Sequence, residues 1–327
     1  MKGFVDLHCD SLYYSYFADP PYSFEKDERF HVDLFRLKEG GVLVQFFAIF
    51  LPTPQIFREA GLEVSEDEVY IDHLMSYMQE MLKKHSDDFA FASSIQEVEA
   101  NRAAGKISAF LTMEDGRAIQ GSFDRLREYY DRGVRLITLT WNGENCFGFP
   151  NSDKKAEMER GLKSFGKEAI EAMNELGIII DVSHLSDGGF WDVAELSQKP
   201  FVASHSNARE LCSHRRNLSD EMIRAVAEKG GVIGVNFNPG FLRKQAEGEW
   251  RSEVKEIVAH LNYLKNKGGE DVLALGSDFD GIGGELEIDG PDRFPYLAES
   301  LLNEGWAARQ IEKFASQNAL RVIADVL

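Results

Sequence analysis

Short apolar segments recur along the chain and alternate with longer segments of helical periodicity. Most of the apolar segments are continuously hydrophobic, which is typical of β-strands buried on both faces. Several follow a glycine, as at Gly133, Gly177 and Gly231, which fits a helix that ends just before a strand. The eight predicted strands are Phe4–Cys9, Val42–Phe50, Ile107–Met113, Val134–Thr140, Ile178–Ser183, Phe201–Ser204, Val232–Phe237 and Val272–Ser277.

Helical patterns fill the intervals between these strands. Ser65 and Glu68 form an S-x-x-E capping box at the start of a pattern that continues to about Lys84. The other predicted helices are Phe123–Arg132, Ser164–Leu176, Ser219–Lys229, Ser252–Lys267, Tyr296–Asn303 and Trp306–Asn318. No linker rich in Pro, Gly or Ser interrupts the alternation, so we expect residues 1–327 to form a single domain.

Eight strands alternating with helices predict an α/β fold, the (β/α)8 or TIM-like barrel. The alternative is an open, doubly wound sheet, which ordinarily carries a glycine-rich phosphate turn after its first strand. The first strand here ends in Asp6-Leu7-His8-Cys9-Asp10, which contains no glycine. We therefore favour the barrel.

The amino-acid composition limits the binding partners and the cellular compartment that we expect for this protein. The 327 residues include 36 Lys and Arg against 55 Asp and Glu, a formal net charge of −19 that argues against nucleic acid and membrane surfaces as partners. The widely spaced Cys9, Cys146 and Cys212 predict neither a disulfide framework nor a cysteine-based zinc site. The early Asp6 argues against a signal peptide, and no apolar run approaches the roughly 18 residues that span a bilayer. We expect a soluble, cytoplasmic protein.

Polar side chains gather where the predicted strands end, which is where barrel enzymes place their chemistry. His8 and Asp10 are two residues apart, so they point the same way, while Cys9 points to the other side. Barrel closure brings all such strand ends around one mouth, and so many imidazoles and carboxylates at one rim are hard to explain as packing. The six residues are His8, Asp10, Glu114, His184, His205 and Asp278.

Imidazole and carboxylate ligands without thiolate suit Zn²⁺, with Mn²⁺, Co²⁺ or Fe²⁺ also compatible. Six groups exceed the needs of one tetrahedral ion, so we predict two ions that share a carboxylate. Glu114 is the candidate for the shared ligand, because its strand lies between the others. Water between two cations loses a proton near neutral pH, and the predicted reaction class is therefore metal-assisted hydrolysis.

The segments around these residues occur in a specific order along nearly the whole chain. They are Asp6-Leu7-His8-Cys9-Asp10, Met113-Glu114-Asp115-Gly116, Asp181-Val182-Ser183-His184, Ala203-Ser204-His205-Ser206-Asn207-Ala208, Arg216-Asn217-Leu218-Ser219-Asp220, Gly276-Ser277-Asp278-Phe279-Asp280-Gly281 and Asn318-Ala319-Leu320-Arg321-Val322. In combination they resemble the membrane (renal) dipeptidase family of zinc metallopeptidases, peptidase family M19. The missing signal segment and the unpaired cysteines resemble a soluble, bacterial-type member rather than an anchored, extracellular one.

The resemblance implies a barrel of the metal-dependent hydrolase type that hydrolyses dipeptides, often with a D-residue on the C-terminal side, through a hydroxide bridging two zinc ions. It also implies that the protein forms a homodimer. The residues that carry these implied roles are His8 and Asp10 for one zinc, His184 and His205 for the other, Glu114 for the bridge, Asp278 for proton transfer and Arg216 for the substrate carboxylate.

One position departs from the family pattern. The best-known members have a substrate-contacting histidine after the fourth strand, where this chain reads Thr140-Trp141-Asn142-Gly143. The indole N–H of Trp141 can only donate a hydrogen bond, so Trp141 cannot take over the proton chemistry of a histidine. Asn142 is the neighbour that could substitute for it, and we count both residues as candidates for substrate binding.

Four alternatives stay open at this point. Asp280 shares the strand-end face of Asp278, so either residue could carry the proton. Arg216 is next to Arg215, and the simplest interpretation of this segment is a solvated basic pair. An N-acyl-amino-acid deacylase on the same barrel is the rival enzyme, although many such enzymes begin with H-x-H and bridge their metals with a modified lysine. A noncatalytic, metal-containing protein that binds dipeptides is the second rival, and only Trp141 supports it.

Overall fold

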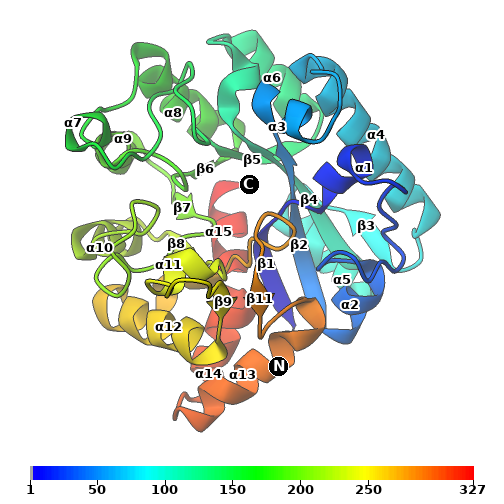
Figure 1. The fold of residues 1–327 in the computed structure, drawn as a ribbon, viewed down its shortest axis with the longest axis vertical. Helices are drawn as coiled ribbons and strands as arrows, with labels where there is room; N and C mark the ends of the chain where they lie inside the picture. Colours follow the sequence, from blue (N-terminus) through cyan, green and yellow to red (C-terminus); the bar gives the residue numbers. More distant parts are fainter. Residues whose placement is uncertain (1–2) are drawn as a thin grey trace.

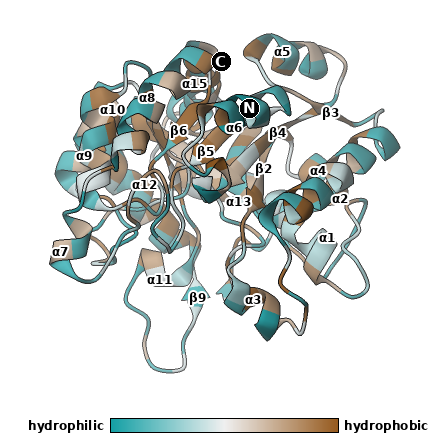
Figure 2. Ribbon diagram, turned by 90° about the horizontal axis from the view of Figure 1, so that it is seen from above, coloured by the Kyte–Doolittle hydropathy of each residue, from teal (hydrophilic) through white to brown (hydrophobic). Residues whose placement is uncertain are grey.

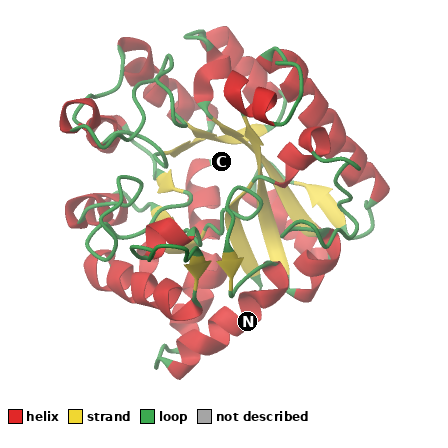
Figure 3. Cartoon of the chain, viewed as in Figure 1, coloured by secondary structure: helices red, strands yellow, loops and turns green. Residues whose placement is uncertain are grey.

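The computed structural model describes residues 3–327, and its central feature is a closed ring of parallel strands. Around the ring the strands follow the order β2-β1-β10-β8-β7-β6-β5-β4, and pairing of β2 with β4 closes it. Figure 3 shows the ring enclosed by helices. The strands are β1 Phe4–Cys9, β2 Val42–Phe50, β4 Ile107–Glu114, β5 Val134–Thr138, β6 Ile179–Asp181, β7 Val202–Ala203, β8 Val232–Val235 and β10 Leu273–Leu275. The predicted (β/α)8 barrel is confirmed.

Three short strands of the described chain lie outside the ring. β3 (Phe89–Phe91) pairs with the first residues of β4, and β9 (Arg251–Ser252) pairs with β11 (Glu285–Leu286) in a separate two-stranded sheet. None of the three was predicted, because a run of two or three residues is too short for its periodicity to stand out.

Helices follow the strands around the outside of the ring (Figure 1). The predicted helix Ser164–Leu176 is α8 with the same bounds, and the predicted helices at α6, α10, α12 and α13 begin and end within two residues of the observed ones. The helices are α1 Tyr14–Phe17, α2 Leu34–Glu39, α3 Pro54–Glu59, α4 Asp67–Lys84, α5 Ile95–Ala103, α6 Phe123–Asp131, α7 Lys155–Met158, α8 Ser164–Leu176, α9 Asp187–Leu196, α10 Asp220–Glu228, α11 Pro239–Leu242, α12 Val254–Gly268, α13 Phe294–Asn303, α14 Ala308–Glu312 and α15 Asn318–Val326.

Two details of the helix prediction are wrong. The hydroxyl of Ser65 donates to the carbonyl of Glu66 at 3.2 Å and α4 begins at Asp67, so Ser65 makes no capping box. The single helix predicted from Trp306 is interrupted by a π-helical turn at Lys313–Gln317.

Helix α9 was not predicted. Its first turn contains Gly188 and Gly189, and paired glycines are typical of a loop. In the structure a Cβ on Gly188 would overlap the carbonyl oxygen of Glu159, so the glycine permits close packing inside a helix.

Apolar side chains form two clusters, a large one between the strands and the surrounding helices and a smaller one at one end of the barrel. In the smaller cluster Phe46 and Phe110 pack with Val322 and Ile323 of α15. Figure 2 shows α15 at the opposite end from the loops that carry α3, α7 and α11, which follow the carboxyl ends of β2, β5 and β8. One end is thus closed by α15, and the other carries the long loops. No helix within residues 3–327 combines the length and apolarity needed to cross a membrane.

Gly234 on β8 and Gly276 after β10 leave the space in which the carbonyl group of Ser204 lies, because a Cβ on either glycine would overlap that oxygen. We expect Gly276→Ala to lower the free energy of unfolding by about 2–3 kcal/mol. Gly283→Ala is the control, since a Cβ there meets no atom within 4 Å, and its effect should stay below about 0.5 kcal/mol. Denaturant titration measures both, and equal stabilities would contradict the close packing.

Candidate metal centre

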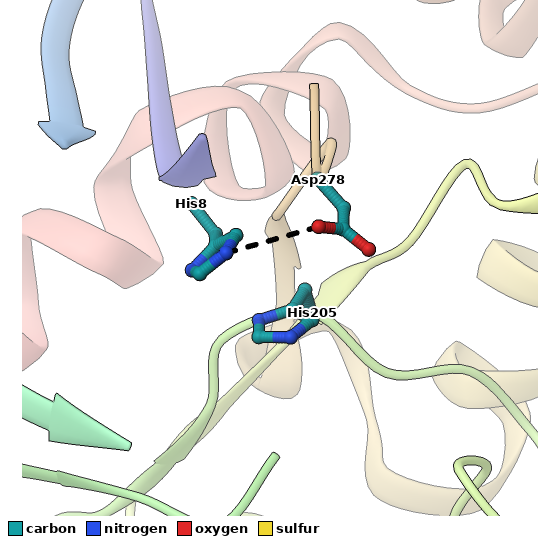
Figure 4. A group of neighbouring side chains, drawn as sticks. All are labelled: His8, His205 and Asp278. Carbon is teal, nitrogen blue, oxygen red and sulfur yellow. Dashed lines mark ion pairs between the residues drawn. The ribbon is translucent and has the colours of Figure 1, made fainter. Parts of the chain in front are cut away.

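The carboxyl ends of the barrel strands bring all six predicted metal-site side chains together. All are buried except His184, which is half-buried. Their ligand atoms fall into three overlapping groups, and within each group the atoms lie within 4.8 Å of one another. Figure 4 shows one of these groups, in which the side chains of His8, His205 and Asp278 converge from different parts of the ring. The groups are His8, His205 and Asp278; Glu114, His184 and His205; and His8, Asp10 and Glu114.

The first oxygen of Glu114 faces two histidines. Glu114 Oε1 lies 3.1 Å from His184 Nε2 and 3.5 Å from His205 Nε2, and the two Nε2 atoms are 3.1 Å apart. Ligand atoms about 2.0–2.1 Å from one tetrahedral zinc lie roughly 3.3 Å from each other. The spacing of the three atoms therefore matches one face of a tetrahedral site.

The second oxygen of Glu114 faces a different group. Glu114 Oε2 lies 3.6 Å from His8 Nε2, which is itself 3.3 Å from Asp10 Oδ2. Asp278 Oδ1 approaches the same His8 Nε2 at 3.7 Å. Because each Glu114 oxygen belongs to a separate set of neighbours, this one carboxylate connects two candidate metal positions.

Burial controls the charges of the cluster. Burial and the charge of Asp10 raise the pKa of Glu114 to about 8, and burial raises the pKa of Asp278 to about 6. Burial also lowers the pKa values of His184 and His205 far below the usual value, so these imidazoles are neutral and can offer a lone pair. Burial alone would lower the pKa of His8, but the charges of Asp10 and Glu114 raise it, so His8 supplies positive charge to these carboxylates that a bound cation would replace.

Two buried atoms of the cluster have no hydrogen-bond partner among residues 3–327, His8 Nδ1 and Asp10 Oδ1. Buried polar groups are nearly always paired, so an unpaired carboxylate oxygen calls for an explanation. A metal ion bound at Asp10 supplies one, and the donor types of all six residues fit a divalent cation.

The backbone is strained beside these ligands. Asp115, His184 and Asp278 have φ angles of 77°, 67° and 63°, in the left-handed region that favours glycine. Such residues cost on the order of 1–3 kcal/mol each and cluster at functional sites. The turns also explain why β6 and β10 end earlier than predicted, since the chain leaves the sheet before His184 and Asp278.

The hydrogen bonds distinguish Asp278 from Asp280. Both oxygens of Asp280 are occupied, by the hydroxyl of Ser11 at 2.5 Å and by the backbone N–H groups of His31 and Val32 at 2.7 and 3.3 Å. Asp280 thus connects a distant loop to the strand end. Asp278 accepts one hydrogen bond, from the Asn236 side chain at 2.8 Å, and its other oxygen faces His8. Of the two aspartates, Asp278 is thus the one with an oxygen that faces the cluster.

Arg216 lies close behind the histidines. Its guanidinium donates to the carbonyl of His205 at 3.2 Å and to the hydroxyl of Ser206 at 3.4 Å, while its Nε has no partner among the described residues. Burial lowers the pKa of Arg216 to about 10, which still leaves it charged at neutral pH. Arg215 instead pairs at the surface with Asp153, so Arg216 is the arginine of this pair that lies beside the candidate histidines.

A cavity of about 420 Å³ lies above the metal cluster. Trp141 and Asn142, the candidates for substrate binding, both line it. Asn142 Oδ1 also lies 3.4 Å from His184 Nδ1, where it can accept the ring N–H. Trp141 packs edge-on against Phe50 and also lines a second cavity of about 740 Å³. The other lining residues are Asp10, Tyr13, Tyr14, Phe50, Ile56, Glu114, His184, Asn238, Phe241, Asp278, Asp280 and Gly281.

Sequence reasoning missed Asn236 as a neighbour of Asp278. The predicted strand Val232–Phe237 is too long at its end, which placed Asn236 inside a strand. Because β8 ends at Val235, Asn236 is the first residue beyond it. If the strand had been predicted to end at Val235, Asn236 would have been recognised as a polar residue at a strand end, like the six metal-site candidates. Among the aromatic residues of the cavity, Phe50 ends β2, whereas Tyr13, Tyr14, Trp141 and Phe241 lie between the strands of the ring and offer no comparable signal.

Comparison with known proteins gives a consistent result across the chain. The family model described as membrane dipeptidase (peptidase family M19) matches residues 2–327. An uncharacterised dipeptidase of Schizosaccharomyces pombe is 32% identical over 92% of this chain and 73% of its own length. A dipeptidase of Claviceps purpurea is 27% identical over 98% of this chain and 75% of its own length. A metallopeptidase from Rhodobacter sphaeroides, solved with a phosphinate mimic of the dipeptide L-Ala-D-Ala, superposes with a TM-score of 0.89 at 27% identity and 99% coverage of both chains.

Proposed function

Because this chain belongs to the membrane dipeptidase family (peptidase family M19), it is a metallopeptidase that hydrolyses dipeptides, and we propose that two zinc ions at the Glu114 cluster support the reaction. One observation carries the proposal. The two oxygens of Glu114 face separate groups of ligand atoms at 3.1–3.6 Å, as a bridging carboxylate requires.

His184 and His205 would hold one ion, His8 and Asp10 the other, and Glu114 both. When bound, the two ions would lower the pKa of a water molecule between them and polarise the scissile carbonyl group. Zinc suits imidazole and carboxylate ligands, and Mn²⁺, Co²⁺ or Fe²⁺ would accept the same set.

Asp278 acts as the proton carrier. Asn236 holds one of its oxygens and leaves the other facing the cluster. In that position Asp278 takes the proton that the attacking water gives up and returns it to the leaving amine. The same residue thus serves as base and then as acid.

Arg216 binds the terminal carboxylate of the substrate. A guanidinium fork matches a carboxylate, and its position close to the histidines limits the distance between that carboxylate and the bond to be cut. The cavity of about 420 Å³ is of a size for a dipeptide. The complex of the Rhodobacter sphaeroides metallopeptidase with an L-Ala-D-Ala mimic supports substrates with a D-residue on the C-terminal side.

Asn142 and Trp141 complete the substrate-binding side of the cavity. Asn142 orients His184 through the ring nitrogen that faces away from the metal position. Trp141 presents an apolar wall to the substrate side chain and contributes no proton transfer. The proton chemistry therefore rests on Asp278 alone.

We expect Arg216→Met to lower kcat/KM for dipeptides by about 10- to 100-fold, mainly through KM, because it removes charged hydrogen bonds to the substrate carboxylate. Arg215→Met is the matched control, since Arg215 pairs with Asp153 at the surface. Dipeptide amides, which lack the carboxylate, should be hydrolysed equally by the parent protein and by Arg216→Met. An unchanged KM for dipeptides in Arg216→Met would contradict the role of Arg216.

The test of the function is a substrate panel on zinc-loaded protein. It contains L,L- and L,D-dipeptides beside N-acetylated amino acids, with bound zinc measured on the same samples. We expect turnover of dipeptides, including L,D-dipeptides, and none of the N-acetylated compounds. Cleavage of the N-acetylated compounds alone would assign a deacylase, and binding of dipeptides without cleavage would assign a noncatalytic binding protein.

The cytoplasm is the compartment we propose. Cys9, Cys146 and Cys212 are all free thiols, and free thiols persist in a reducing environment.

A further inference from the structure

The carboxylate of Asp181, at the end of β6, lies fully buried beneath the metal cluster and collects four hydrogen bonds. Its Oδ1 accepts the backbone N–H groups of Ser183 at 3.0 Å and Ser204 at 2.8 Å. Its Oδ2 accepts the hydroxyls of Thr138 at 2.6 Å and Ser204 at 2.5 Å. Both oxygens of the carboxylate therefore act as acceptors, each from two donors. The proposed function uses none of them.

The Ser204 hydroxyl also contacts a metal-site histidine, since Ser204 Oγ lies 2.7 Å from His205 Nδ1. A hydroxyl has a single proton, and Ser204 gives it to Asp181. Its oxygen must therefore accept the N–H of His205 Nδ1. When the ring carries one proton, that proton sits on Nδ1, and Nε2 keeps its lone pair facing Glu114 and His184.

We propose that Asp181 and Ser204 are positioning residues that fix the tautomer of His205 so that its Nε2 is ready for metal before any ion arrives. The inference rests on the proposed metal centre. Metal-bound histidines commonly donate their other ring N–H to a carboxylate, which sets both the tautomer and the ring orientation. Here a serine hydroxyl is inserted between ring and carboxylate. Thr138, Asp181 and Ser204 lie at the ends of three neighbouring strands, β5, β6 and β7.

The other two histidines lack this arrangement. His184 Nδ1 faces the exposed side chain of Asn142 at 3.4 Å, and His8 Nδ1 has no partner in the described part of the chain. His205 is also fully buried, together with Ser204 and Asp181. Among the three imidazoles, His205 is therefore the one whose tautomer the protein itself determines.

Asp181→Asn tests the direction of the two hydrogen bonds that connect Asp181 through Ser204 to His205. In this variant an amide nitrogen takes the place of Oδ2 and donates a hydrogen bond to Ser204 Oγ. The Ser204 hydroxyl then donates its proton to His205 Nδ1, and the proton of the His205 ring is therefore on Nε2. An asparagine that replaces the aspartate of the Ser-His-Asp triad causes the same tautomer error. We expect nitrogen NMR of the metal-free parent protein to show His205 protonated on Nδ1 and that of Asp181→Asn to show it protonated on Nε2. The zinc affinity of Asp181→Asn should fall by about 10- to 100-fold or more.

Ser204→Ala and Ser277→Ala form the matched pair of controls. Ser277 also donates its hydroxyl to a buried carboxylate, that of Asp6 at 2.7 Å, yet it makes no hydrogen bond to an imidazole ring. Ser204→Ala should yield a mixture of His205 tautomers and about tenfold weaker zinc binding, whereas Ser277→Ala should leave the His205 signals unchanged. Ser204→Thr, which keeps the hydroxyl, should restore the Nδ1 tautomer.

Nε2 protonation of His205 in the metal-free parent protein would overturn the inference. So would an affinity loss in Ser204→Ala without a change in tautomer, since that result indicates a merely structural role. The parent spectrum and Ser204→Ala decide the matter even where Asp181→Asn does not fold. The tautomer is measured without substrate, so a protein with the expected spectra that cleaves no dipeptide would refute the proposed function and leave this inference standing.

Discussion

Replacing Glu114 with glutamine is expected to abolish tight metal binding and to lower kcat/KM for dipeptides by at least about a thousandfold. Glu114 is the group shared by both candidate metal positions, and its Oε1 and Oε2 have different neighbours. An amide offers one neutral oxygen and an NH₂ group that repels cations, so one position loses its anionic ligand. Removing metal-assisted charge stabilisation costs several kcal/mol of the barrier, which corresponds to this loss in rate. Metal analysis and steady-state kinetics measure the two effects.

Asp115→Asn is the control for Glu114→Gln. Asp115 is the next residue and is also buried, but it pairs with Arg117 at 3.4 Å and accepts from Asn145 at 2.7 Å, away from the histidines. The control should retain its metal. Full metal content and full activity in Glu114→Gln would contradict the bridging role.

Asp278→Asn is expected to lower kcat by about 10²- to 10⁴-fold while both ions stay bound, because an amide cannot take a proton from water or return it to the leaving amine. Asp278 keeps one oxygen on Asn236 at 2.8 Å, and the asparagine oxygen can preserve that contact. Kinetics and metal analysis on the same preparation separate the two functions. Loss of metal together with activity would make Asp278 a ligand instead of a proton carrier.

Asp280→Asn is the companion variant to Asp278→Asn. Asp280 connects its strand end to the loop at His31 and Val32. The effect of this variant should fall on thermal stability and leave the proton-transfer step intact. A loss of kcat equal to that of Asp278→Asn, at unchanged stability, would assign the proton to Asp280.

The candidate metal residues could be predicted because their signal is local. Each lies at or shortly beyond the carboxyl end of an apolar strand, and the alternation at His8, Cys9 and Asp10 placed two candidate ligands on one side and a buried thiol on the other. Barrel closure then follows from the number of strands, since parallel strands ending at one rim bring such residues together. The fold class and the cluster therefore needed no long-range information beyond the strand count.

The contacts that tune the site could not be predicted in this way, because they join residues far apart in the sequence. Asp280 receives the backbone N–H of His31, 249 residues away, and Asp181 receives the hydroxyl of Thr138, 43 residues away. Neither pairing follows from periodicity or spacing. Strand ends were also placed too late, since the turns at His184 and Asp278 rely on left-handed backbone that non-glycine residues rarely adopt.

Some of the acidic residues that give the chain its negative charge are concentrated in the candidate metal centre. Asp10, Glu114 and Asp278 lie within one buried cluster, where burial raises the pKa values of the latter two to about 8 and about 6. Two divalent cations would offset this concentration of carboxylates. Elsewhere acids form surface ion pairs, such as that of Glu270 with Arg309, which contribute little to stability individually.

The central claim is a dipeptidase that works with two ions joined by Glu114. Its most direct test is a titration of the metal-free protein with Zn²⁺, in which bound zinc and hydrolysis of an L,D-dipeptide are measured on the same samples. We expect no hydrolysis without metal and a maximum that is reached only when two ions are bound per chain. Full activity in the metal-free protein, or a maximum at one ion per chain that a second ion does not raise, would contradict it.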